Sequence, residues 1–279
     1  MKKILSLVMV AVMILGMMTL FVGCDNKKDN QLVMATNAAF PPYEYKEGSS
    51  FKGIDVEIAQ AIADKLGMEL VIEDVEFGSV LSGVAQGKYD FGMAGITVTE
   101  DRKKSMDFSD SYATGIQVII VNDGSPIATL DDLFIFDEKG DPIALKNPDI
   151  KIGVQENTTG DIYSSSAITK WGFNDLNKDE SIKTDRVTRF RAGADAIAAL
   201  KAGRVDCVII DNEPAKSFVA ANDGIHILEG ENEYAVEDYA ICVKKGNSEL
   251  LNDINKALAE LKADGTIDRI IQKYIPSNG

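Results

Sequence analysis

The sequence contains little histidine, cysteine or tryptophan. Its 279 residues include one histidine (His226), three cysteines and one tryptophan. A His-dependent catalytic triad, or a metal site built from several histidines, is therefore not expected. The chain also lacks a CxxC pair, an HExxH motif and a glycine-rich phosphate-binding loop. The sequence thus predicts no cofactor, no metal and no enzymatic activity.

Basic residues are also scarce relative to acidic ones. There are 29 Lys and Arg against 44 Asp and Glu, which gives a formal net charge of -15. Such a surface repels nucleic acid and anionic lipid headgroups, so no nucleic-acid partner is expected. The apolar fraction of 45% is ordinary for a globular chain, and the length allows one large domain or two modest ones.

One long hydrophobic run is present, at the N-terminus. Two lysines precede an apolar stretch over residues 4–22, which ends at Gly23 and Cys24. A basic start, an apolar core and a small residue before the cut predict a signal peptide over residues 1–23. The cysteine resembles that of the bacterial lipobox, which implies a lipid (diacylglycerol, palmitate) on Cys24 and a polar tether over residues 24–31. An uncleaved membrane anchor is the alternative, because the run nearly reaches spanning length.

Beyond residue 31 the pattern alternates short apolar runs with helical periods. Strands are expected near 32–36 and 69–75, and helices near 54–66 and 79–86. A weak repeat supports an α/β class: an apolar helix face, a glycine stop with a basic residue, and a strand occur at 81–94 and again at 197–210. Two similar units, each presenting polar groups where strands end, predict one cleft between them.

Several residues suit a small zwitterion. Phe40 lies on a proline-stiffened loop and Phe77 opens a loop-helix, so both could form apolar walls, although ordinary core positions are equally consistent. Arg102 follows a Thr helix cap, and a solvated surface charge is its alternative role. Asp211 comes directly after a buried strand, where it could also cap the next helix, and Thr159 would open another helix whose first amides can hold an anion.

Two further features concern packing. Cys207 and Cys242 each lie in an apolar, strand-like run, and we expect two buried, unpaired thiols. Turn signals at 122–126 and 137–142 predict a surface excursion around a short helix near 130–134, which continues over residues 134–148. Two amphipathic helices are expected near the C-terminus, over 247–265 and from 267 to 274.

The ordered fragments of the chain resemble one known family, the extracellular solute-binding proteins of polar amino-acid ABC importers (family 3). The likeness covers residues 32–274. Its markers are AFPPYE at 39–44, GIDV at 53–56, AGITVTEDRK at 94–103, DFSDSY at 107–112, GVQENTT at 153–159 and ADGT at 263–266.

The resemblance implies a two-lobed periplasmic-binding-protein fold with two hinge crossovers and a cleft between the lobes. Lobe 1 would comprise residues 32–111 plus 239–279, and lobe 2 would comprise 117–233. The hinges would lie near 112–116 and 234–238. It further implies a monomer outside the cytoplasm that captures an amino acid by lobe closure and delivers it to an ABC permease in the membrane.

The resemblance also implies roles for single residues. Arg102 would hold the ligand α-carboxylate through two parallel bonds, helped by the backbone amides of Thr97 and Thr159. Asp211 and the Gly95 carbonyl would take the α-ammonium. The walls and the specificity groups would be Phe40, Phe77, Asn37 and Gln155.

Ligand identity depends on the two amides. Relatives that bind cationic side chains often carry an acid at the position of Asn37, so Asn37 with Gln155 predicts a polar uncharged amino acid such as glutamine. Glu44 or Glu156 could reach the pocket, however, so a cationic amino acid or cystine remains an alternative. A sensing module and a dehydratase-like enzyme are alternative functions for the same scaffold.

Overall fold

The computed structural model describes residues 30–228 and 236–276, and Leu32–Gly279 forms one compact unit. The predicted signal peptide, Cys24 and most of the tether lie outside the described residues, as does the start of the second predicted hinge. Within the described ranges, no helix combines the length and apolar character needed to cross a membrane.

Lobe 1 is built on a five-stranded sheet with the order β5-β1-β6-β19-β7. β1 pairs in parallel with β6, whereas β19 runs antiparallel to both β6 and β7. A second, three-stranded sheet has the order β2-β3-β4. The strands are β1 (Gln31–Thr36), β2 (Ala39–Phe40), β3 (Glu44–Glu47), β4 (Ser50–Lys52), β5 (Glu69–Asp74), β6 (Phe91–Gly92), β7 (Met106–Phe108) and β19 (Cys242–Lys244).

The helices of lobe 1 follow the predicted periodicity. In α2, Ile54, Ile58 and Ile62 recur at a spacing of four and are all buried, and Gly67 ends the helix in the left-handed conformation (φ 67°) that glycine adopts without strain. The helix predicted at 79–86 begins two residues earlier, at Phe77. The helices are α2 (Ile54–Leu66), α3 (Phe77–Gln86), the short α4 (Glu100–Lys103), α8 (Ser248–Ala263) and α9 (Thr266–Tyr274).

Lobe 2 contains a second five-stranded sheet with the order β15-β12-β16-β9-β17. β12 is parallel to both β15 and β16, and β16 is antiparallel to β9. All five residues of β16 are buried, which explains its continuous apolar sequence before the final aspartate. The elements are β9 (Gln117–Asn122), β12 (Ile152–Gln155), α5 (Thr159–Ser164), β15 (Val187–Phe190), α6 (Gly193–Lys201), β16 (Cys207–Asp211), α7 (Asn212–Ala220) and β17 (Ile225–Ile227).

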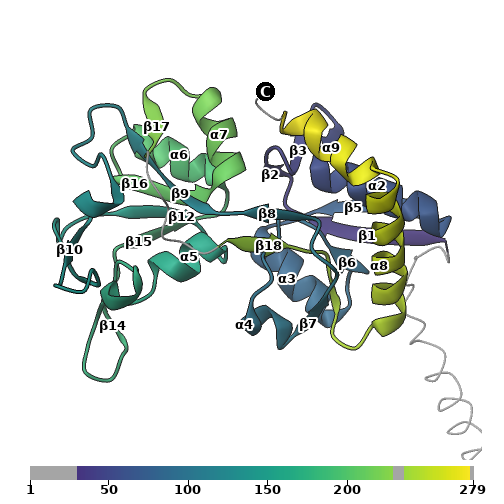
Figure 1. The fold of residues 1–279 in the computed structure, drawn as a ribbon, viewed down its shortest axis with the longest axis horizontal. Coiled ribbons are helices and arrows are strands. Elements are labelled where there is room, and N and C mark those ends of the chain that lie inside the picture. The colour runs from purple at the N-terminus through teal and green to yellow at the C-terminus, as the bar shows by residue number, and fades with distance from the viewer. Residues whose placement is uncertain (1–29, 229–235, 277–279) are drawn as a thin grey trace, which may run out of the picture. The chain divides into compact units, whose positions relative to one another are not determined.

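Two antiparallel strands, β8 (Ala113–Gly115) and β18 (Glu237–Tyr239), lie between the two sheets (Figure 1). Gly115 is required here, because a Cβ atom at this position would lie 2.3 Å from the Tyr239 hydroxyl. The repeat seen in the sequence corresponds to α3 followed by β6 in lobe 1 and α6 followed by β16 in lobe 2. The α/β class is therefore confirmed, with one five-stranded sheet in each lobe.

The surface excursion expected around a short helix near 130–134 is present, and residues 137–141 and 146–149 are exposed. A helical turn covers only η1 (Leu130–Asp132), and the chain continues into the antiparallel hairpin β10 (Phe134–Phe136) and β11 (Pro142–Leu145). Phe134 has an exposed fraction of 0% and packs on the rings of Trp171 and Phe173, next to η2 (Ile168–Lys170). The segment is anchored by this second apolar cluster of lobe 2.

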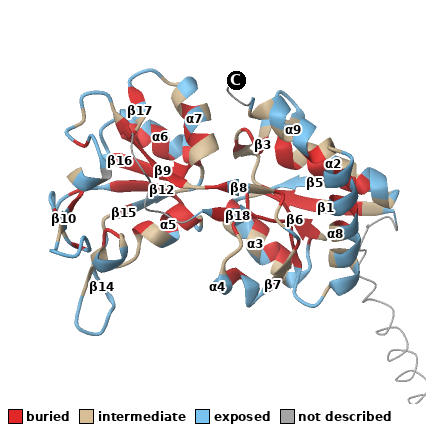
Figure 2. Ribbon diagram, viewed as in Figure 1, coloured by how far each residue is buried: buried red, intermediate tan, exposed pale blue. Residues whose placement is uncertain are grey.

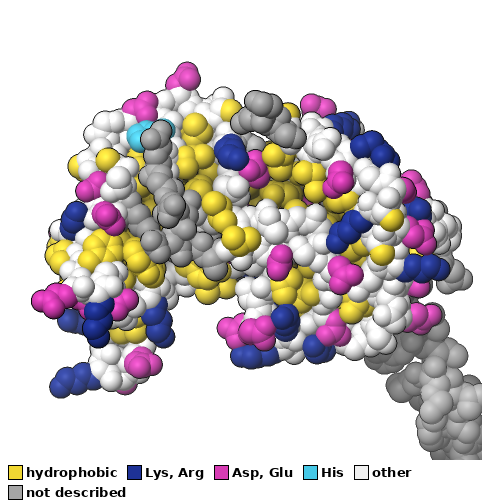
Figure 3. Space-filling model, in the orientation of Figure 1, with side chains coloured by type: hydrophobic (Ala, Val, Ile, Leu, Met, Phe, Trp, Pro, Cys, Tyr) yellow, Lys and Arg dark blue, Asp and Glu magenta, His cyan; other side chains and the backbone are white. Residues whose placement is uncertain are grey.

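Burial separates the interior from the surface along each element (Figure 2). Cys207 and Cys242 are buried and unpaired, as predicted. Lobe 2 also carries the exposed hairpin β13 (Asp175–Leu176) and β14 (Ile182–Thr184). On the face drawn in Figure 3, Lys and Arg side chains lie between Asp and Glu side chains, and the residues coloured there form no continuous basic patch.

Candidate functional site

The nine residues predicted from the sequence line one pocket. The cavity between them is small, about 10 Å³, which is room for about one water molecule, so the lining side chains nearly meet. Glu44, Ala94 and Thr158 complete the lining. The predicted members are Asn37, Phe40, Phe77, Gly95, Thr97, Arg102, Gln155, Thr159 and Asp211.

Strand ends position most of these side chains. Asn37 follows β1, Gln155 ends β12 and Asp211 ends β16, while Gly95 and Thr97 follow β6. Because the carboxyl ends of parallel strands meet at the same edge of a sheet, residues distant in sequence converge there. The two lobes approach closely at this edge, where Gln155 Nε2 donates to Asn37 Oδ1 at 2.9 Å.

Arg102 is the central cation of the pocket. It lies in α4, whose N-cap Thr99 accepts a hydrogen bond from the Arg102 backbone, and its side chain is 7% exposed. Its guanidinium donates to the carbonyls of Thr97 at 2.7 Å and Asn157 at 2.9 Å. Burial lowers the pKa of Arg102, but a guanidinium remains charged at neutral pH. Among the described residues no carboxylate lies within 4.0 Å of it, so the alternative of a solvated surface charge is wrong.

Asp211 supplies a negative charge in the same pocket. It is 3% exposed, and its carboxylate accepts a hydrogen bond from the Tyr239 hydroxyl. Asp211 occupies the N-cap position of α7, but its side chain makes no capping hydrogen bond. The alternative role as a helix cap is therefore wrong. Burial and the Glu237 carboxylate raise the pKa of Asp211 to about 7, because the ionised form lacks a cationic partner.

Two aromatic rings form the apolar walls. Phe40 is 6% exposed and stacks on Tyr43 with 6.3 Å between ring centroids. Gly95, with φ 53°, leaves room for the Phe40 ring, since a Cβ atom at residue 95 would lie 3.1 Å from a carbon of that ring. The Phe77 ring lies beneath the Arg102 guanidinium, 5.4 Å from its carbon atom, and so restricts how that group can turn.

The two predicted specificity residues form an amide pair at one side of the pocket. Asn37 Nδ2 donates to the Val75 carbonyl at 2.9 Å, and Asn37 Oδ1 accepts from Gln155. Gln155 Oε1 is buried and has no hydrogen-bond partner. An unpaired buried acceptor is unfavourable unless a donor reaches it. This subsite therefore contains a buried acceptor without a donor.

Glu44 lines the pocket, whereas Glu156 is exposed. Glu44 is 1% exposed, and its carboxyl group shares a hydrogen bond with that of Asp55. Burial, followed by the neighbouring Asp55 carboxyl, raises the pKa of Glu44 well above its usual range. The sequence placed Glu44 in the AFPPYE fragment, but spacing alone did not distinguish it from Glu156.

Glu237, which the sequence prediction omitted, connects both lobes behind the pocket. Its Oε2 atom accepts hydrogen bonds from the hydroxyls of Thr97 and Thr159, each at 3.0 Å, and from Gln117 Nε2 at 3.3 Å. Thr97 belongs to lobe 1, and Thr159 and Gln117 belong to lobe 2. Hydrogen bonds from their hydroxyls to Glu237 therefore help to fix the positions of both threonines. No periodicity in the sequence indicates such a contact, because Glu237 is at least 78 residues from each of the three donors along the chain.

The buried charges around the pocket are mainly negative. Arg102 is the one buried cation in the part of the chain that the structure describes. The buried carboxyl groups nearby are Glu44, Asp55, Asp211 and Glu237. Burial raises the pKa of Asp55 to about 6 as well, although its carboxylate accepts hydrogen bonds from the Gly95 amide and the Tyr112 hydroxyl. A ligand that carries positive charge would relieve this imbalance.

Comparison with known proteins gives consistent results. The profile of the family described as bacterial extracellular solute-binding proteins, family 3, matches residues 32–277. An arginine-binding extracellular protein of Bacillus subtilis (strain 168) is 29% identical over 252 residues, which cover 90% of this chain and 88% of the relative.

Two solved structures of ancestral arginine-binding proteins also match. One is bound to arginine, with 37% identity, a TM-score of 0.72 and coverage of 88% of this chain and 98% of that one. The other is bound to glutamine, with 36% identity, a TM-score of 0.72 and coverage of 89% and 99%. The likeness therefore extends over both lobes.

Proposed function

The chain belongs to the bacterial extracellular solute-binding proteins, family 3, and we propose that it captures an L-α-amino acid by lobe closure and delivers it to an ABC permease. The lobes would be residues 32–111 with 239–279, and 117–233. The chain would bend near 112–116 and 234–238, which include the strands β8 and β18. A lipid on Cys24 would hold the protein at the outer face of the membrane.

One observation carries this proposal: a buried guanidinium without a carboxylate partner shares a pocket with a buried carboxylate. Arg102 uses two of its five N–H groups on backbone carbonyls, which leaves three for a ligand. An α-carboxylate would take a bidentate pair of bonds from them, supported by the Thr97 and Thr159 amides. The α-ammonium would bind Asp211 and the Gly95 carbonyl. The charges of the ligand would then offset the cost of burying the Arg102 guanidinium and the Asp211 carboxylate.

Arginine is the preferred ligand in this proposal. Its guanidinium would donate to the unpaired acceptor Gln155 Oε1 and lie near the Glu44 carboxyl group, and its positive charge would compensate the acid-rich surroundings. Glutamine, predicted from the sequence, is the second candidate, since the amide pair of Asn37 and Gln155 can hydrogen-bond a third amide. The arginine-bound and glutamine-bound ancestral proteins support both candidates.

Capture, not catalysis, is the activity proposed. The single histidine, His226, is exposed on β17 beside Asp123 and does not line the pocket. The aromatic walls and the cross-lobe contacts favour enclosure of a ligand. Release of a product from a candidate dehydratase substrate would contradict this part of the proposal.

A thermal-shift screen of the twenty amino acids plus cystine tests the proposal, because a ligand that binds only the folded state raises the melting temperature. We expect the largest shift with L-arginine and a smaller one with L-glutamine. Arg102→Ala should abolish both shifts while leaving the melting temperature without amino acid nearly unchanged. Arg204→Ala, at an exposed arginine of lobe 2, is the matched control and should retain them. Wild-type shifts in Arg102→Ala would overturn the assignment.

A further inference from the structure

Asn157 contacts lobe 1 at two points from the loop between β12 and α5. Its carbonyl oxygen accepts a hydrogen bond from Nη2 of Arg102 at 2.9 Å. Its side chain lies against α3, where Nδ2 is 2.8 Å from the place that a Cβ atom would occupy on Gly78. Asn157 does not line the ligand pocket, but it joins a groove beside it that includes Gly78, Arg102 and Asp161. The residue thus bridges the lobes outside the ligand subsites.

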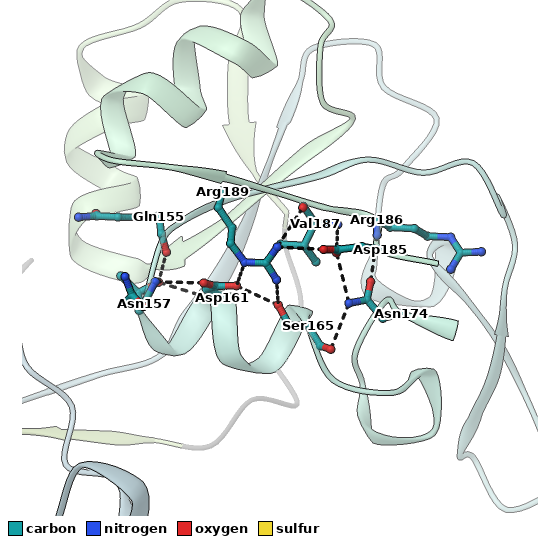
Figure 4. Close-up of polar contacts among 10 residues, drawn as sticks. Gln155, Asn157, Asp161, Ser165, Asn174, Asp185, Arg186, Val187 and Arg189 are labelled. Carbon is teal, nitrogen blue, oxygen red and sulfur yellow. Dashed lines mark hydrogen bonds and ion pairs between the residues drawn. The ribbon is translucent and has the colours of Figure 1, made fainter. Parts of the chain in front are cut away.

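A polar network within lobe 2 holds Asn157 in an uncommon backbone conformation. Its φ is 67°, in the left-handed region that side chains other than glycine rarely adopt. Its backbone N–H donates to Asp161 Oδ2 at 3.0 Å, and Asp161 Oδ1 accepts from Arg189 Nε at 2.9 Å (Figure 4). Arg189 is held in turn by Ser165 at 2.6 Å and Asp185 at 3.0 Å. The turn is therefore preorganised inside one lobe, without help from the other.

We propose that Asn157 is a positioning residue that orients Arg102 only when the lobes are closed, which rests on the proposed capture of an amino acid between them. Lobe 1 alone provides the Thr97 carbonyl for Nη1 of Arg102. The second carbonyl, from Asn157, arrives with lobe 2 and fixes the plane of the guanidinium. With both carbonyls in place, the remaining N–H groups keep one direction for the ligand carboxylate. Closure and carboxylate binding are thereby coupled through one backbone oxygen.

Gly78 makes this contact possible. It is the second residue of α3, and a methyl group there would lie 2.8 Å from Nδ2 of the exposed Asn157 side chain, which would have to turn aside in the closed form. A methyl group at residue 78 meets Asn157 only when the lobes approach. Gly78→Ala should therefore leave lobe 1 intact and disfavour the closed form.

A rescue experiment tests the contact. Dissociation constants for L-arginine and L-glutamine are measured by calorimetry on the full mature chain. We expect Gly78→Ala to weaken binding about tenfold, as for an overpacked contact. Asn157→Gly removes the opposing side chain and keeps access to the left-handed conformation. Gly78→Ala combined with Asn157→Gly should therefore bind within about threefold of Asn157→Gly alone. Ser82→Ala, at an exposed position of the same helix, is the control and should have no effect.

A second comparison tests the backbone role. Asn157→Ala should weaken binding by about fivefold or more through faster dissociation, because alanine disfavours the left-handed turn that presents the carbonyl, whereas Asn157→Gly should stay within about threefold of wild type. Glu180→Ala provides the control, since Glu180 has φ 62° but lies in the exposed β13–β14 hairpin. Equal effects of alanine and glycine at residue 157, or no rescue of Gly78→Ala, would overturn the inference.

A ligand-independent measurement separates this inference from the proposed function. Dyes on Asp253→Cys in lobe 1 and Lys178→Cys in lobe 2, both exposed, report the closed fraction by energy transfer. Gly78→Ala should lower that fraction without any amino acid, and Asn157→Gly should restore it. If the wild-type protein binds no amino acid, the proposed function is refuted. The closed fraction would still show whether Asn157 and Gly78 meet when the lobes close. An unchanged closed fraction in Gly78→Ala would refute the contact whatever the ligand.

Discussion

Replacing Asp211 by asparagine should change stability and binding in opposite directions. Burial and Glu237 raise the pKa of Asp211 from 3.8 to about 7. A raised carboxyl pKa means that the folded chain holds the proton more tightly than the unfolded chain. The stability that this proton confers is therefore present near pH 4 and is lost as the pH rises through about 7. A shift of roughly three units at 1.36 kcal/mol per unit sets an upper limit of about 4 kcal/mol for keeping Asp211 ionised in the folded chain.

Asparagine has nearly the same shape and avoids that ionisation. Part of the gain is lost, because the Tyr239 hydroxyl exchanges a charged acceptor for a neutral one. We expect Asp211→Asn to raise the free energy of unfolding at pH 8 by about 1–2 kcal/mol without amino acid, and by much less at pH 5, where Asp211 is already protonated. Urea denaturation at the two pH values measures the difference.

The same substitution should nearly abolish capture. The ligand ammonium would lose its carboxylate partner, and removal of one member of a buried pair weakens binding by about 2–5 kcal/mol, or roughly 30- to 5000-fold. Calorimetry with L-arginine at pH 8 measures the loss. Asp223→Asn makes the same charge change at an exposed position just after α7 and should alter neither quantity. A less stable Asp211→Asn protein at pH 8, or one that binds arginine normally, would refute the reasoning.

Two further predictions concern the ligand. Arginine binding should weaken as the pH falls from 8 to 5.5, by up to about tenfold per pH unit below 7, because protonation of Asp211 removes the charge that pairs with the ligand ammonium; calorimetry across this range measures it, and tighter binding at low pH would contradict the assignment. Asn37→Asp should shift the preference further from glutamine towards arginine and lysine by about tenfold, since it adds a carboxylate beside Gln155. Competition of the three amino acids against one another gives the ranking, and an unaltered order would remove Asn37 from the side-chain subsite.

Much of the candidate site could be predicted from the sequence because strand ends are local features. Asp211 follows five residues of buried strand, and Gly95 and Thr97 follow a short one, so topology places them at the cleft. The helix boundaries of α2 and α8 also follow from periodicity and caps, which depend on residues three or four apart. These patterns are determined before any long-range contact forms.

The excursion over residues 134–148 shows what such reasoning leaves undecided. Turn signals predicted a surface excursion, and residues 137–141 are exposed, yet Phe134 at its start is fully buried against Trp171 and Phe173. The partners lie more than thirty residues away, and their rings carry no periodic signal that pairs them with Phe134. Only packing of the whole lobe decides that this ring is core.

By itself, the sequence determined the α/β class, the family resemblance and the strand-end residues, since each depends on local spacing or on the order of short fragments. The tertiary structure decided that Glu44 enters the pocket and Glu156 does not, that Glu237 joins the hydroxyls of two lobes, and that Asn157 meets Gly78. Each of these contacts links segments far apart in the chain. Their energies arise from burial and from hydrogen bonds that exist only after the lobes have folded and come together, so no spacing along the chain encodes them.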